Sequence, residues 1–70
     1  MPDMKKVASS NIDSIGYDRT SKTLYVSFLS SGTYQFPDVP EDIYHGLEAA
    51  KSKGVYFAKA IRPNYKGTPV

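Results

Sequence analysis

The absence of cysteine in a chain of seventy residues is the feature that most limits how this protein can fold. A small domain without disulfides or a structural metal depends on one densely packed core. The single histidine, His45, leaves almost no ligands for zinc, and we expect neither a metal nor a cofactor. Six tyrosines and three phenylalanines are available to fill the core. The sequence therefore predicts one domain held together by aromatic and aliphatic side chains.

The N-terminal segment is not expected to be a signal peptide. The N-terminal segment 1–18 lacks the apolar run of a signal peptide, and no stretch of the sequence is apolar enough to span a membrane. We therefore expect a cytoplasmic protein that has no membrane partner. We also expect a flexible arm over residues 1–7, a single domain over residues 8–66, and a frayed tail over residues 67–70.

Three segments have the composition and alternation of β-strands. The first covers residues 10–17, in which Ile12 and Ile15 are three residues apart with a glycine following them. This spacing predicts a β-bulge, because strict alternation would place the two isoleucines on opposite faces. The second strand covers residues 23–29 and the third covers residues 33–36.

The turn between the second and third strands decides which face Tyr34 and Phe36 occupy. A three-residue loop, Ser30–Gly32, pairs Leu29 with Thr33 and directs both rings onto the apolar face of the second strand. A two-residue loop would direct both rings outward. We favour the longer loop, because it gives the sheet one apolar and one polar face.

Aromatic rings on a sheet can also stack nucleobases, which is the alternative role for Tyr34 and Phe36. The turn argument favours the core for both. Tyr25 lies on the opposite face of the same sheet and is then the better stacking candidate.

Two helices are expected after the third strand. Asp38 is the predicted N-cap of a helix that covers Glu41–Ser52, and Gly54 is its predicted C-cap. A second, shorter helix is predicted over Val55–Arg62, because a proline follows it. Its buried stripe contains Phe57 and Ile61. The expected fold is α+β: a three-stranded antiparallel meander packed against one main helix and a short second helix, in the order β-β-β-α-α.

No residue pattern in the sequence points to catalysis. His45 stands between Asp42 and Glu48 on the polar side of the predicted main helix, which is typical of a solvated helix face with no cleft. The five glycines form no phosphate-binding loop. We therefore expect a protein that is not an enzyme and has no catalytic residues.

Positive charge is concentrated at the C-terminal end. The last twenty residues contain five basic side chains and no acidic one, with tyrosines between them. Such a composition is typical of single-stranded nucleic-acid binding, although solubilising surface lysines are the alternative explanation. The candidate phosphate contacts are Lys51, Lys53, Lys59, Arg62 and Lys66, and the candidate stacking residues are Tyr25 and Tyr65.

A second hypothesis is a protein-interaction or oligomerisation module. Its partner would be another protein or a second copy of the chain, and the contact surface would be the Tyr25–Leu29 face or an exposed sheet edge.

Several short motifs follow one another in the order and spacing of a known family. They are residues 7–12, 15–18, 23–28, 32–36, 39–40, 44 and 52–57, followed by Ile61, Arg62 and Tyr65. Together they resemble the KTSC domain over residues 7–66. The central Tyr-x-Tyr motif of that family falls on Tyr34 and Phe36, and Ala58 stands where the family has an asparagine.

The resemblance implies a domain found at the C-terminus of some lysyl-tRNA synthetases and as free-standing small bacterial and phage proteins. The synthetase context suggests RNA binding, and it agrees with the basic C-terminal segment. From both arguments we expect a small binding module for RNA or another single-stranded nucleic acid.

Overall fold

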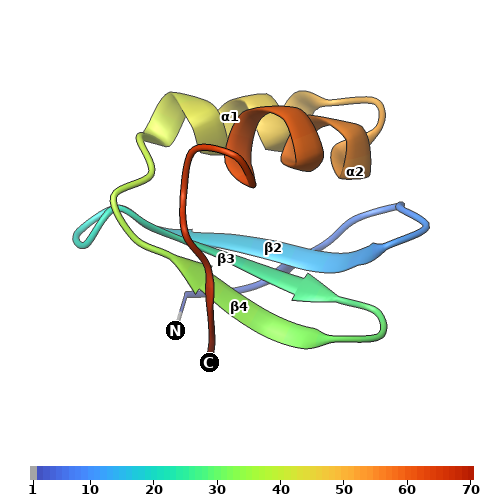
Figure 1. Ribbon diagram of the computed structural model, residues 1–70, viewed down its shortest axis with the longest axis horizontal. Coiled ribbons are helices and arrows are strands. Elements are labelled where there is room, and N and C mark those ends of the chain that lie inside the picture. Colours follow the sequence, from blue (N-terminus) through green and yellow to red (C-terminus); the bar gives the residue numbers. More distant parts are fainter. Residues whose placement is uncertain (1) are drawn as a thin grey trace.

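The structure, a computed structural model that describes residues 2–70, is an α+β fold in which helices cover one face of an antiparallel sheet (Figure 1). The main strands are β2 (Ile12–Asp18), β3 (Thr23–Phe28) and β4 (Gly32–Phe36). The helices are α1 (Glu41–Ala49), α2 (Lys53–Tyr56) and η1 (Phe57–Ile61), a turn of π-helix that continues α2. Two-residue strands β1 (Lys5–Lys6) and β5 (Thr68–Pro69) complete the sheet, whose order over these residues is β1-β2-β3-β4-β5.

The α+β class is confirmed, but the expected count of three strands is wrong. The strands β1 and β5 lie in the segments expected to be an arm and a tail, where they pair antiparallel with β2 and β4. A strand of two residues is too short to show alternation, and proline is unfavourable inside a strand, so the sequence predicts neither of these strands. Met1, the first residue of the expected arm, lies outside the described residues.

The bulge expected in the first strand is confirmed. The pairing register of β2 with β3 shifts between Ile12 and Ser14, so Asp13 is the extra residue. The bulge returns Ile15 to the face of Ile12. Both isoleucine side chains are consequently buried under the helices.

The expected face of Tyr34 and Phe36 is confirmed, whereas the expected pairing is wrong by two residues. The loop consists of residues 29–31, and Gly32 is already the first residue of β4, with a positive φ of 85°. Leu24 therefore lies opposite Phe36. A slip of two residues preserves the face of every side chain, which is why the prediction of an apolar face survives.

Both predicted caps of the main helix are wrong. Asp38 has a φ of 61°, and Pro40 occupies the N-cap position without a side-chain hydrogen bond. Helix α1 ends at Ala49, and Gly54 lies inside α2 rather than capping α1. The second helix begins earlier than expected because the Ser52 hydroxyl accepts a hydrogen bond from a backbone N–H in its first turn.

The core lies between the sheet and the helices. Its fully buried side chains are Ile12, Ile15, Leu24, Val26, Val39, Leu47 and Ile61. The predicted buried stripe of the second helix, Phe57 and Ile61, is confirmed. The helices found in residues 2–70 are all too short or too polar to cross a membrane.

Candidate functional site

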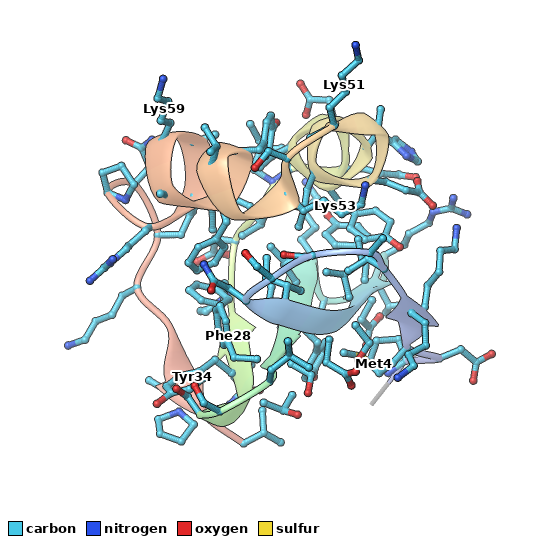
Figure 2. The ribbon with its side chains drawn as sticks, turned by 90° about the vertical axis from the view of Figure 1, so that its right-hand side faces the viewer. Met4, Phe28, Tyr34, Lys51, Lys53 and Lys59 are labelled. Atoms are coloured by element: carbon cyan, nitrogen blue, oxygen red, sulfur yellow. The ribbon has the colours of Figure 1, made fainter. Side chains whose placement is uncertain are left out.

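An open groove beside the second helix collects aromatic rings and two cations. It has a volume of about 490 Å³. Its rings are Phe28, Tyr34, Phe36, Phe57 and Tyr65, and its cations are Arg62 and Lys66. No acidic side chain lines it among the described residues. We name this feature the aromatic groove, and Figure 2 shows Phe28 and Tyr34 below the second helix on this side of the molecule.

Four rings of the aromatic groove are fixed against one another. Phe28 packs edge to face against Tyr34 and against Phe57, with ring centroids 5.9 Å and 5.3 Å apart. Phe57 packs in the same way against Phe36, at 5.4 Å. Such pairs are favourable beyond the area that they bury. The rings therefore form a pre-organised apolar wall contributed by β3, β4 and η1.

The other wall is built by the chain that follows η1. The backbone N–H groups of Asn64 and Tyr65 both donate to the carbonyl of Ile61, at 3.0 Å and 2.8 Å, which reverses the chain after Pro63. The segment then returns to the sheet and ends in β5, beside β4. This reversal carries Lys66 back to the side of the groove.

The structure brings together three of the predicted site residues. Arg62, Tyr65 and Lys66 line the aromatic groove. Arg62 and Lys66 are exposed, whereas Tyr65 is half-buried and packs against the core. Positive charge and an aromatic ring are thus adjacent, as the sequence hypothesis requires.

The remaining predicted cations lie elsewhere. Lys51 and Lys53 line a separate pocket of about 430 Å³ at the start of α2, where the Lys53 ammonium donates to the carbonyl of Ala50 over 2.8 Å. Lys51 and Lys59 are both exposed and project away from the sheet (Figure 2), but Lys59 lines neither this pocket nor the aromatic groove. The basic segment is therefore divided over more than one side of the helix.

Tyr25 is separated from the other stacking candidate. It is half-buried in β3, opposite Gly16 and Gln35, on the face of the sheet that the helices do not cover. Sequence reasoning missed Phe28 and Phe57 as groove residues. The alternation of the strand places Phe28 on the apolar face, and helical spacing places Phe57 in a buried stripe. No local pattern in the sequence predicts that η1 lies beside β3.

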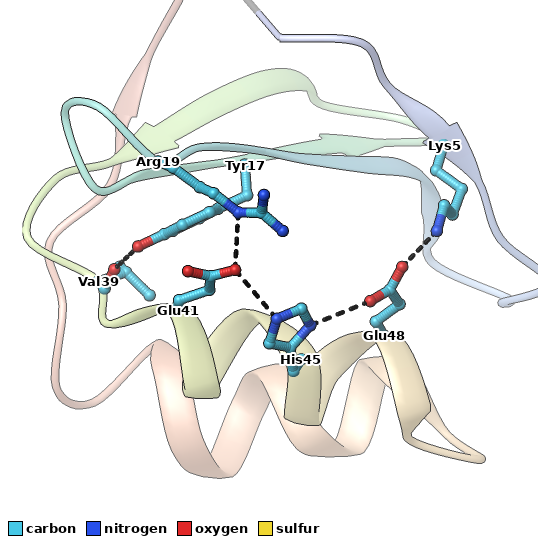
Figure 3. Close-up of polar contacts among 7 residues, drawn as sticks. All are labelled: Lys5, Tyr17, Arg19, Val39, Glu41, His45 and Glu48. Carbon is cyan, nitrogen blue, oxygen red and sulfur yellow. Dashed lines mark hydrogen bonds and ion pairs between the residues drawn. The ribbon is translucent and has the colours of Figure 1, made fainter.

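His45 is exposed on the polar face of α1, as expected, but a hollow that the sequence did not predict lies beside it. This polar cleft of about 680 Å³ lies between α1 and the sheet. Four of its polar residues, Arg19, His45, Glu48 and Lys5, form a chain of contacts that also includes the neighbouring Glu41 (Figure 3). The His45 Nε2 lies 3.1 Å from a Glu41 carboxylate oxygen, and Nδ1 lies 3.4 Å from Glu48. The outer partners are Arg19, 2.7 Å from Glu41, and Lys5, which is paired with Glu48.

Two stacked tyrosines form the apolar floor of this cleft. The rings of Tyr17 and Tyr44 are 5.1 Å apart and nearly parallel. Burial raises the pKa of both phenols. Hydrogen bonds from Lys5 and His45 lower the pKa of Glu48. Glu41, His45 and Glu48 all belong to α1, so the contacts that tie this helix to the sheet side are the Arg19–Glu41 and Lys5–Glu48 ion pairs.

Within residues 2–70, no group of three or more His, Cys, Asp or Glu side chains is placed to hold a metal ion.

Comparisons with known proteins match almost the whole chain. The KTSC domain family model matches residues 8–65. A crystal structure of a KTSC domain protein from Yersinia pestis superposes with a TM-score of 0.94 at 35% identity, and covers 97% of this chain and 96% of that one. An uncharacterised protein of Stutzerimonas stutzeri is 36% identical over 64 residues, which are 89% of this chain and 90% of that protein.

Lysine–tRNA ligases also contain a similar segment. The ligase of Nostoc punctiforme is 33% identical over 61 residues, and that of Trichormus variabilis is 36% identical over 61 residues. In both cases the match covers 87% of this chain but only 11% of the ligase. On the family model and these relatives, the chain belongs to the KTSC domain family.

Proposed function

We propose that this protein is a non-catalytic module that binds single-stranded RNA in the aromatic groove. The observation that carries the proposal is the meeting of three partly exposed rings, Phe28, Tyr34 and Tyr65, with Arg62 and Lys66 in one groove. Phe36 and Phe57 are buried and support these rings from below, and the described lining contains no acidic side chain. Aromatic faces stack nucleobases of any sequence, and adjacent cations bind the phosphates between them. The proposal includes a cytoplasmic location and no cofactor.

The dimensions and charges of the groove suit such a ligand. A volume of about 490 Å³ falls within the range of roughly 300–1,000 Å³ that small-ligand sites have. A stacked base contributes about 1–3 kcal/mol to binding. Arg62 offers a planar guanidinium that bonds phosphate with two N–H groups, and Lys66 adds a mobile charge.

The relatives favour RNA over DNA as the ligand. Two of the similar proteins are named lysine–tRNA ligases, which act on an RNA. A domain that occurs within such proteins and also alone fits an accessory RNA-binding role. Since this chain matches 11% of each ligase, the proposal concerns binding alone and carries over none of the ligase activity.

The experiment is a fluorescence-anisotropy titration of labelled single-stranded RNA at two salt concentrations. We expect the double variant Arg62→Glu/Lys66→Glu to abolish binding while its thermal unfolding stays normal, since both side chains are exposed. Lys59→Glu is the control, because Lys59 projects away from the groove. Equal losses from Lys59→Glu, or no binding by wild type at low salt, would refute the proposal.

A protein partner, or a second copy of the chain, is the alternative function. The Tyr25–Leu29 face offers Leu29 as an exposed large hydrophobic residue, 59% accessible, at the tip of the hairpin. Tyr25 and Ser27 on the same segment are half-buried. Sedimentation of the titration samples tests this alternative, which predicts a mass that rises with protein concentration and is insensitive to salt.

A further inference from the structure

We infer that the aromatic groove is one end of a longer track for a single RNA strand, and that Lys51 and Lys53 bind phosphate at its other end. This inference rests on the proposed function and adds to it the path and the length of the bound strand. The observation that carries it is a hollow that lies between these two ends and shares lining residues with each of them.

A third hollow, of about 380 Å³, connects the two ends. It shares Phe28, Phe57 and Arg62 with the aromatic groove. It shares Asn11 and Gly54 with the pocket of Lys51 and Lys53. The three hollows are therefore neighbours in a row along the second helix, beside the loops of the sheet, and we call this row the channel.

The charge along this channel has one sign. None of the residues described as lining the three hollows is acidic, and each end carries two cations. The cleft of Arg19, His45 and Glu48 is a different hollow, with its own lining. A polyanion in the channel therefore meets attraction at both ends and no carboxylate between them.

The chemistry differs from one end to the other. The aromatic groove supplies rings for bases together with Arg62 and Lys66, whereas the far end supplies hydroxyls, amides and two ammonium groups without an aromatic ring. The strand would stack its bases at the first end and place only backbone at the second. Single-stranded sites on OB folds hold about 4–16 nucleotides, and we expect this track to hold a strand at the lower end of that range.

The first test compares oligouridylates of two and six nucleotides, both labelled with fluorescein. Lys51→Gln/Lys53→Gln should weaken binding of the hexanucleotide about tenfold and leave the dinucleotide unchanged. The slope of log K against log salt should fall by about 0.7 for each phosphate contact that is lost. Lys59→Gln is the control, and an equal loss from it would contradict the track, because the effect would then be general charge.

The second test blocks the channel at its middle. A Cβ on Gly54 would meet only the Asn11 side chain, at 3.6 Å, so alanine fits there, and thermal unfolding of Gly54→Glu checks that the longer side chain leaves the fold intact. Gly54→Glu should weaken hexanucleotide binding at least tenfold and spare the dinucleotide, whereas Gly54→Ala should change neither. Unchanged hexanucleotide binding in Gly54→Glu would overturn the inference.

The two proposals fail in distinguishable ways. If wild type binds neither oligonucleotide, the proposed function is wrong and the track is wrong with it. If Arg62→Glu/Lys66→Glu abolishes binding of both lengths but the Lys51, Lys53 and Gly54 variants bind the hexanucleotide normally, only the track is wrong.

Discussion

The backbone at Gly67 lies directly against the ring of Phe36, so closely that a Cβ at this position would overlap the ring. This contact brings the C-terminal segment beside β4, where Thr68 pairs with Gln35 and the Val70 N–H donates to the carbonyl of Thr33 over 3.0 Å. The same contact positions the segment that carries Lys66, and this segment forms one wall of the aromatic groove. The shape of the groove thus depends on a residue without a side chain.

Gly67→Ala should destabilise the protein by about 1–3 kcal/mol, since the added methyl group must displace the Phe36 ring or the segment that carries β5. Urea denaturation followed by circular dichroism measures the change. Gly54→Ala is the matched control, because a Cβ there has space. A helical glycine replaced by alanine should keep or raise stability, by up to about 1 kcal/mol. Equal stability of the two variants would contradict the packing described for Gly67.

Tyr17→Phe should cost about 1–3 kcal/mol of stability, because the Tyr17 hydroxyl donates to the carbonyl of Val39 over 2.5 Å. Val39 is fully buried, so its carbonyl would lose a partner where water cannot replace it. Thermal and urea unfolding measure the loss. Tyr25→Phe, on the outer face of the sheet, should unfold like wild type. A Tyr17→Phe protein as stable as wild type would show that the bond contributes nothing.

Glu48→Gln should remove part of the acid sensitivity of the fold. Hydrogen bonds from Lys5 and His45 hold the pKa of Glu48 below its ordinary value of 4.5. The stabilisation is therefore fully present above pH 4.5 and disappears as the pH falls through the lowered folded-state pKa. Melting temperatures of wild type and Glu48→Gln should differ at pH 6 and converge as the pH falls below the lowered pKa of Glu48. The exposed Asp42→Asn is the control, and a difference that persists in acid would contradict this assignment.

Tyr65→Leu should weaken RNA binding by roughly 5- to 150-fold, which corresponds to about 1–3 kcal/mol for one stacked base. Leucine keeps apolar contact with the core, so the fold should persist. Tyr25→Leu should bind RNA like wild type, since Tyr25 lies on the face opposite the groove. Anisotropy titration decides between them. If Tyr25→Leu is the weaker binder, the outer face of the sheet is the stacking surface.

The sequence predicts the main elements of this fold because their signals are local. The alternation in β3, the three-residue spacing of Ile12 and Ile15, and the stripe of Phe57 and Ile61 each depend on a single segment. The hairpin shows the limit of such reasoning. The face on which the β4 side chains lie depends on whether the loop has an odd or an even number of residues. The pairing register depends on where in the turn Gly32 adopts its positive φ, and the expected and the observed registers both allow a glycine there.

The candidate site could be predicted only in part. The excess of positive charge near Arg62 and Lys66 is visible in the sequence, as is the apolar face that carries Tyr34. Their meeting depends on the reversal of the chain after Pro63 and on the short strand β5. Neither has a periodic signal. The cleft at His45 was missed for the same reason, because Lys5 reaches Glu48 from a strand of two residues.

The most direct test of the central claim is a titration of ¹⁵N-labelled protein with a single-stranded hexanucleotide RNA, followed by amide chemical shifts. We predict salt-sensitive shifts that concentrate on Phe28, Tyr34, Phe57, Arg62 and Lys66, with little change around Lys5, Arg19 and His45 on the other cleft. Shifts centred on the His45 cleft or on Tyr25, or no shifts at millimolar RNA in low salt, would contradict RNA binding in the aromatic groove.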